Sequence, residues 1–128
     1  MSHFSKIRTT IRDIEMLKLA LNDLGLSWTT NHFLYNNYSG EFYNADLVIQ
    51  QQNNSNIGFL WNGKEYELIA DHQLWKQRWS IECFIEKLAQ SYAYNSILFE
   101  SINQGFTKLE DKSLSNGIIS LKFQRWLN

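Results

Sequence analysis

One stretch of the chain, residues 57–70, constrains the fold more than any other. It reads IGFLWNGKEYELIA, with the dipeptide Asn62-Gly63 at its centre. Both residues tolerate a positive φ, so the dipeptide predicts the two-residue type I′ turn whose twist matches that of flanking antiparallel strands. We therefore expect a β-hairpin here, with its two strands running outward from Asn62 and Gly63.

The predicted register gives this hairpin two unlike faces. A sheet that is apolar on one side must be covered there, while its charged side faces solvent. The hairpin is thus predicted to be half-buried, with two glutamates on its solvated face. The apolar face has Ile57 opposite Leu68, Phe59 opposite Tyr66 and Trp61 opposite Lys64, and the other face has Leu60 opposite Glu65 and Gly58 opposite Glu67.

Apolar residues at helical spacing predict two amphipathic helices around the hairpin. The first begins with Thr10 as N-cap and Asp13 in capping-box position, and it ends at Gly25. The second begins with Ser80 as N-cap and runs to Gly105. We interpret both apolar stripes as core rather than as a cofactor or partner groove. They are Ile14, Leu17, Leu21 and Leu24, then Ile81, Phe84, Ile85, Leu88, Tyr92 and Phe99.

Alternating patterns predict further strands before the hairpin. Residues 3–9 are typical of a short edge strand and residues 26–30 of a second short strand. Residues 45–51 alternate with Leu47 and Ile49 on one face, which predicts a third strand. Between the second and third, residues 32–44 are polar and aromatic, and we expect a hairpin-like loop that turns at Gly40.

After the second predicted helix, residues 106–110 and 118–126 favour two C-terminal strands. The element order is then β-α-β-β-β-β-α-β-β. Consecutive short strands joined by turns form a meander, and two amphipathic helices must bury their stripes against it. The sequence therefore predicts a single α+β domain over residues 1–128, with an antiparallel sheet (the meander plus the C-terminal strands) covered on one face by two helices.

Charge and cysteine content narrow the function classes. Twelve basic and thirteen acidic residues give a net charge of −1. Without a basic surplus there is no field to attract nucleic acid, so we expect none as a partner. The single cysteine, Cys83, excludes an internal disulfide. No apolar stretch approaches the ~20 residues that a membrane span requires.

Residues suited to catalysis or metal binding are scattered. His3, His32, His72 and Cys83 fall on separate predicted elements, so we expect no metal site and no cofactor. Cys83 lies in the first turn of the second predicted helix, where a thiol can be activated, but its apolar neighbours favour an inert core residue. No glycine-rich phosphate loop is present. The sequence names no catalytic residue.

A cluster of tryptophan and arginine follows the hairpin, and it is the candidate binding surface. Arginine over indole is a favourable pair, and both residues dominate protein interfaces when exposed. If buried, the same cluster merely plugs the end of the sheet, and we favour this reading because Trp is mostly buried. The residues are Asp71, His72, Trp75, Arg78 and Trp79, to which Arg125 and Trp126 are added near the C-terminus.

Several long motifs together resemble the hypothetical chloroplast open reading frame 35 family of plastids and cyanobacteria. They are the opening MSHFSKIRTTIRDIEMLKLAL, the central IGFLWNGKEYELIAD, the YAYN stretch at Tyr92 to Asn95 and the closing FQRW. Thirteen asparagines and no proline suit an AT-rich plastid genome. The resemblance implies a plastid-encoded, stromal or stroma-facing protein, and it brings no assigned reaction. Residues 32–44 depart most from the family pattern.

Two functional hypotheses follow from these observations. The first is a non-enzymatic accessory protein of the plastid that contacts another protein, in the assembly or maintenance of photosynthetic complexes. The second is a small-ligand-binding protein or enzyme with a pocket between the helices and the sheet, holding Arg78, Arg125, His72 or Cys83. RNA binding through exposed aromatics is disfavoured, because stacking on bases works on a basic background.

Overall fold

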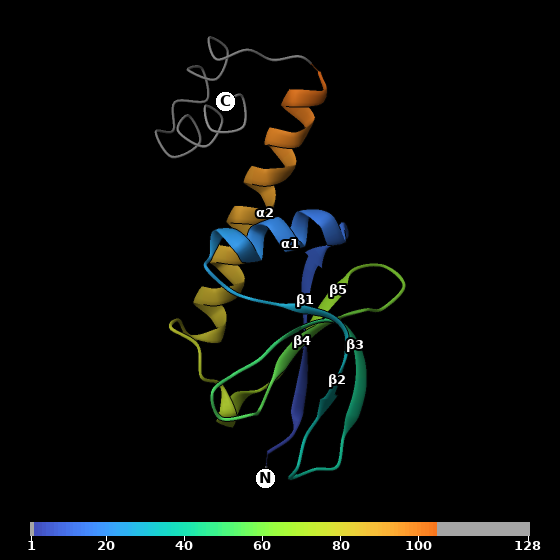
Figure 1. The fold of residues 1–128 in the computed structure, drawn as a ribbon, viewed down its shortest axis with the longest axis vertical. Helices are drawn as coiled ribbons and strands as arrows, with labels where there is room; N and C mark the ends of the chain where they lie inside the picture. The colour runs from blue at the N-terminus through green and yellow to red at the C-terminus, as the bar shows by residue number, and fades with distance from the viewer. Residues whose placement is uncertain (1, 105–128) are drawn as a thin grey trace.

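A computed structural model describes residues 2–104 of the chain (Figure 1). The predicted strands at residues 106–110 and 118–126, and the predicted helix end at Gly105, lie outside the described residues. The elements are β1 (Phe4–Ile11), α1 (Ile14–Asp23), β2 (Thr29–Tyr35), β3 (Phe42–Ile49), β4 (Ile57–Trp61), β5 (Tyr66–Asp71), a 3₁₀ turn (His72–Leu74) and α2 (Ile81–Asn103).

The five strands form one antiparallel sheet in the order β1-β5-β4-β3-β2. Strands β2 to β5 are the predicted meander, and β1 adds to β5 as the predicted edge strand. Helices α1 and α2 pack against each other and lie on one side of this sheet, and α2 extends beyond it (Figure 1). The α+β prediction with two helices over an antiparallel sheet is confirmed.

The main core lies between the helices and the sheet. Helices α1 and α2 both turn apolar side chains toward the same sheet face, so side chains from the two helices and from the sheet bury one another between the two layers. The second helix has the predicted cap, since the Ser80 hydroxyl accepts the Cys83 N–H at 3.2 Å. The largest buried side chains of this core are Phe59, Phe84, Ile11, Leu17, Leu21, Leu47, Ile57, Leu68 and Leu88.

The predicted type I′ turn is wrong, although the hairpin is present. Tyr66 pairs with Trp61 rather than with Phe59, so four residues, 62–65, form the loop. The Asn62 side-chain oxygen accepts the N–H groups of Lys64 and Glu65 at 2.9 and 2.8 Å. This local capture by an Asn side chain competes with the tighter turn. The register shift is two residues, so each side chain keeps its predicted face.

The solvated position predicted for Glu65 is also wrong. Glu65 is only 2% exposed, and its carboxylate accepts a hydrogen bond from the Arg8 guanidinium of β1. Loop closure through Asn62 turns Glu65 toward the edge strand, where this ion pair satisfies it. A neighbouring strand 57 residues away in sequence therefore decided the environment of this carboxylate.

The first helix begins later than predicted, because β1 continues to Ile11. Ile11 is 1% exposed and pairs with Tyr66 across a break in the β1 register, where Thr10 has a φ of 63°. Asp13 is the actual N-cap, and its carboxylate accepts the N–H groups of Glu15 and Met16 at 2.8 and 3.3 Å. Sheet pairing thus removed Thr10 from the helix.

Residues 29–49 form a longer hairpin than predicted, with β2 and β3 extending through most of the expected loop. This β2–β3 hairpin bends across the sheet face opposite the helices. Asn36, in its loop, donates to the Asp71 carboxylate at 2.9 Å, and Tyr43 packs against the ring of Phe4 at 5.9 Å. The hairpin therefore reaches β1 and β5, although β4 separates it from β5 in the sheet.

Gly58 makes this bend sterically feasible. A Cβ at this position would lie 2.8 Å from Leu34 Cδ1, 2.8 Å from the Leu47 carbonyl oxygen and 3.1 Å from Ala45 Cβ. Backbone oxygen cannot give way as a flexible side chain can, so only glycine fits. Behind Gly58, the second and smaller core consists of Leu34, Ala45, Val48 and Ile69.

Candidate functional site

Asp71, the first residue of the predicted surface, is structural in its contacts. It ends β5 and is 2% exposed. One carboxylate oxygen accepts the Gln73 N–H at 3.0 Å and the other accepts the Asn36 amide at 2.9 Å. Charge-assisted hydrogen bonds of this kind offset the desolvation of a buried carboxylate. Asp71 therefore caps the 3₁₀ turn and anchors the β2–β3 hairpin.

Trp75 and Trp79 hold each other at the edge of the main core. The Trp75 indole N–H donates to the Trp79 carbonyl at 2.7 Å, and its ring lies 5.2 Å from the ring of Phe84 in α2. Both tryptophans are partly buried against the helix-covered core. The sequence left open whether these rings are exposed for binding or buried at the end of the sheet. Both rings are partly buried, so each packs on the core and also meets solvent.

Two cations lie close to the Trp79 ring. The Arg78 guanidinium lies 4.5 Å from the centroid of its ring, and the Lys87 ammonium of α2 lies 5.3 Å from it. Arg78 and His72 are exposed. We call Arg78, Trp79 and Lys87 the Trp79 surface. The predicted members Arg125 and Trp126 lie outside the described residues.

Gln51 positions this segment, and sequence reasoning missed it. It is 6% exposed, and its side-chain oxygen accepts the Lys76 N–H at 2.8 Å and the Gln77 amide at 3.0 Å. Its amide donates to the Leu74 carbonyl at 3.0 Å and to the Ser55 carbonyl. A glutamine in a polar QQQNN run gives no sequence signal that separates it from its solvated neighbours.

A second surface, also missed, lies on the β2–β3 hairpin. Phe33, Tyr35 and Phe42 are 56%, 54% and 56% exposed, although all three are aromatic. Tyr35 pairs with Phe42 in the register, and the rings of Phe33 and Phe42 are 5.0 Å apart. We call these three residues the hairpin aromatic patch. Alternating aromatic residues within 32–44 could have indicated it, had the segment been recognised as strand.

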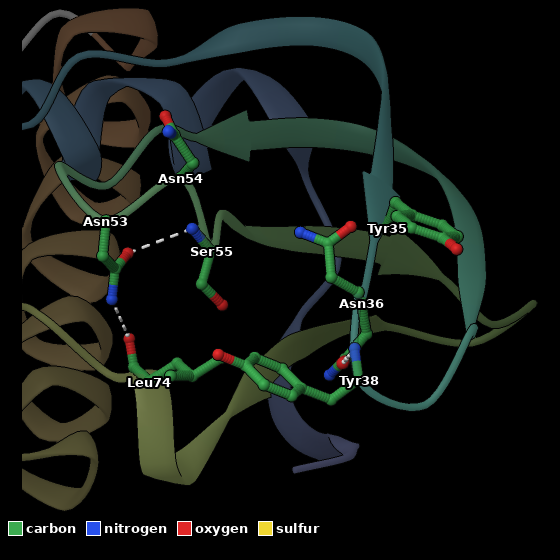
Figure 2. A pocket seen from close by; sticks show the side chains of 8 residues that line it. Tyr35, Asn36, Tyr38, Asn53, Asn54, Ser55 and Leu74 are labelled. Atoms are coloured by element: carbon green, nitrogen blue, oxygen red, sulfur yellow. Dashed lines mark hydrogen bonds between the residues drawn. The ribbon is translucent and has the colours of Figure 1, made fainter.

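A pocket of about 210 Å³ lies between the β2–β3 loop and the β3–β4 loop. In Figure 2 the Tyr38 ring extends across it toward Leu74, and Asn53 bridges to the opposite wall by donating to the Leu74 carbonyl at 2.9 Å. No charged side chain lines the pocket. The lining residues are Tyr35, Asn36, Asn37, Tyr38, Asn53, Asn54, Ser55 and Leu74.

Glu41 fastens the β2–β3 loop to the start of β1. Its carboxylate accepts the Phe4 N–H at 2.8 Å and the Ser39 hydroxyl at 2.8 Å, with the imidazole of His3 at 3.7 Å. The Phe4 N–H contributes most to lowering the pKa of Glu41 below its ordinary value, and Ser39 adds to this. Both donors favour the charged carboxylate, so the loop is fastened best when Glu41 is ionised.

The YAYN motif joins the two helices. The Tyr92 hydroxyl accepts the N–H groups of Arg12 and Asp13 at 3.3 and 3.1 Å, at the entry to α1. The Asn95 amide donates to the Asp23 carboxylate at 2.7 Å, at the end of α1. These contacts give the motif a structural role, because they satisfy backbone and carboxylate groups at both ends of α1.

The candidate catalytic residues do not converge. Cys83 is partly buried in the first turn of α2, and within residues 2–104 no hydrogen bond or ion pair joins it to His72. Across the described part of the chain, no three His, Cys, Asp or Glu side chains gather where they could hold a metal ion. In the same part, no helix combines the length and the apolar character required to cross a membrane.

Comparisons with known proteins give a consistent assignment. The model of a family described as "Protein of unknown function (DUF1257)" matches residues 20–122. The chain is 48% identical to "Uncharacterized protein ycf35" of Guillardia theta and 49% identical to the protein of that name in Pyropia yezoensis, over 126 residues and 98% of both chains in each case. The protein of that name in Cyanophora paradoxa is 44% identical over the same share. No solved structure matches this chain.

Proposed function

This chain belongs to the DUF1257 family of unknown function and is a relative of the ycf35 proteins, and we propose that it is a non-enzymatic accessory protein that binds another protein. We propose that it acts in the plastid stroma, in the assembly or maintenance of photosynthetic complexes. The resemblance to the chloroplast open reading frame family and the ycf35 names of its relatives support a plastid-encoded protein, and the stromal location is part of the proposal.

The observation that carries the proposal is the fixed arrangement of Trp79. Its backbone carbonyl is held by Trp75, and its ring is flanked by Arg78 and Lys87. Trp and Arg dominate the energy of protein interfaces. A ring and a guanidinium that are already positioned lose less freedom on binding than mobile side chains do. The Trp79 surface therefore offers a prearranged contact for a partner.

The hydrogen bonds of Gln51 to the backbone before Arg78 also support this proposal. Gln51 fixes the backbone at Leu74 and Lys76, immediately before the Trp79 surface, through bonds to both residues. Residues that hold a contact segment in place without touching the partner lower the ordering cost of binding. The segment thus combines a rigid base with exposed Arg78, as a binding site requires.

The test is affinity capture from plastid stroma with a tagged full-length chain. We expect a protein that the native chain recovers repeatedly and that the double variant Trp79→Ala, Arg78→Ala fails to recover. Trp28→Ala is the matched control, since Lys18 lies 5.3 Å from the centroid of its ring on another part of the molecule. If the double variant recovers the same proteins as the native chain, the Trp79 surface is not the contact.

A second candidate function, the binding of a small neutral molecule, is favoured by the pocket between the two loops. Its amides, hydroxyls and two tyrosines can hold a polar ligand with an apolar face. The pocket lies away from His72, Arg78 and Cys83, which were expected to line one. Saturation-transfer NMR with neutral sugars and nucleosides tests this candidate, because Tyr38→Ala must abolish any transfer seen with the native chain.

A further inference from the structure

Strand β2 is the outermost strand of the sheet formed by the described residues. In the order β1-β5-β4-β3-β2, it pairs only with β3 among the described residues. The Phe33 N–H donates to Nδ1 of the adjacent His32 at 2.9 Å, so it points away from β3. Because N–H groups alternate along an antiparallel strand, the Tyr35 N–H points in the same direction. Both N–H groups thus face the outer edge, where another strand can accept from the Tyr35 N–H directly and from the Phe33 N–H once His32 releases it.

Apart from Asn31, whose φ is 51°, this edge lacks the features by which proteins prevent edge pairing. Such features are charged side chains, prolines and register breaks. The opposite edge, β1, has exposed Lys6 and Arg8 and a register break before Ile11. In contrast, residues 29–40 contain no Lys, Arg, Asp, Glu or Pro. One edge of the sheet is therefore protected and the other is not.

The hairpin aromatic patch lies along the unprotected edge. Its three side chains are each more than half exposed, which corresponds to roughly 100 Å² per ring. Their sum, roughly 300 Å², is already the size of the largest apolar patch on a typical monomer. It is somewhat less than half of the ~800 Å² that each partner contributes to a standard interface. The backbone of β2 and the exposed side chains of residues 29–32 lie beside it and supply further area.

We propose that β2 pairs antiparallel with β2 of a second copy of this chain, about a two-fold axis at Leu34. An axis there places Phe33 opposite Tyr35 of the second copy and joins the two sheets into one. A two-fold axis also brings every nearby charge close to its own copy, so a self-pairing edge must be neutral. The β2 edge is neutral, whereas the β1 edge would set Lys6 and Arg8 against their own copies.

The inference concerns a surface separate from the Trp79 surface, so each can fail without the other. Self-association through β2 leaves the Trp79 surface free on both copies, since that surface consists of Arg78, Trp79 and Lys87, none of which lies in β2. A dimer would then present that surface twice. Two linked sites raise the apparent affinity for a partner that can engage both.

Sedimentation velocity of the purified full-length chain over a concentration series tests the proposal. We expect a species of twice the 15.2 kDa chain mass. Phe33→Lys and Tyr35→Glu must each weaken this dimer by on the order of 100-fold, because each buries an unpaired charge in the interface. Mixing the two variants must restore it, since the axis sets Lys at position 33 opposite Glu at position 35. Tyr38→Lys, in the loop outside β2, is the matched control and must stay dimeric.

Hydrogen exchange of the native chain provides a test that needs no variant. Exchange at the Tyr35 amide must slow as protein concentration rises, while the amides of α1 keep their rates. A native chain that stays monomeric at every concentration overturns the proposal. So does a dimer that persists in both charged variants, or one that the Tyr38→Lys control disrupts equally.

Discussion

The two faces of the sheet are held by different means. The helix-covered face buries large side chains such as Phe59 and Phe84, and many interchangeable contacts hold it. On the opposite face, the β2–β3 hairpin covers a smaller core. It is fastened there at a few points, namely Gly58, the Asn36 bond to Asp71 and the Glu41 bond to Phe4. The first face depends on buried area and the second on individual atoms. They should therefore respond differently to substitution.

The largest effect is expected on the helix-covered face. Phe59 is 0% exposed, so Phe59→Ala leaves a cavity and should lower the free energy of unfolding by about 3–5 kcal/mol. Trp61→Ala, two residues away on the same face but 41% exposed, is the control and should cost far less. Urea denaturation measures both, and equal losses would contradict the placement of this core.

Gly58→Ala tests the opposite face with a single methyl group. The added Cβ meets Leu34 Cδ1 and the Leu47 carbonyl oxygen at 2.8 Å, so we expect a loss of about 1–3 kcal/mol from overpacking. The added Leu34→Ala substitution should remove one of the two clashes. The double variant must then lose less than the sum of the two single losses. Strict additivity in urea denaturation would show that Leu34 does not press on Gly58.

Gln51→Leu keeps the approximate shape of the side chain and removes its hydrogen bonds. The Lys76 N–H loses its acceptor, so we expect a loss of about 1–3 kcal/mol and faster hydrogen exchange at the Lys76 amide. Gln52→Leu, at the exposed neighbouring position, is the control. If both variants behave like the native chain, Gln51 does not hold the segment that carries the Trp79 surface.

The smallest effect concerns pH. The folded chain lowers the pKa of Glu41, chiefly through the Phe4 N–H. A lowered pKa in the folded state gives stability that is present above the ordinary value of 4.5 and is lost as the pH falls through the folded value. Glu41→Gln should therefore make the free energy of unfolding depend less steeply on pH on the acid side. The packing of the main core should stay unchanged. The measurement is the free energy of unfolding of both proteins against pH. If the two curves run parallel below pH 4.5, Glu41 does not fasten the loop to β1.

Local chemistry in the sequence predicted the types and order of the elements from β1 to α2. Ser80 is the N-cap of α2, Gly25 ends the first helical segment with a φ of 76°, and Leu47 and Ile49 share the buried face of β3. Each of these signals acts within a few residues, through a cap, a turn or a strand period. The hairpin around Asn62-Gly63 was predicted for the same reason.

Tertiary contacts decided what the local signals left open. Strand pairing with β5 extended β1 through Thr10, and Arg8 buried Glu65 across 57 residues of sequence. The candidate surface divided in the same way, because Asn36 drew Asp71 into the interior while Arg78 stayed in solvent.

Tertiary contacts also decided the four-residue turn, the bend of the β2–β3 hairpin and the position of β2 as the outermost strand among the described residues. The spacing of apolar residues and the helix caps indicate which residues face the core. They do not indicate which distant strand these residues contact. The sequence by itself therefore determined an α+β chain with its buried faces, and only the packed structure decided the registers, the buried carboxylates and the exposed surfaces.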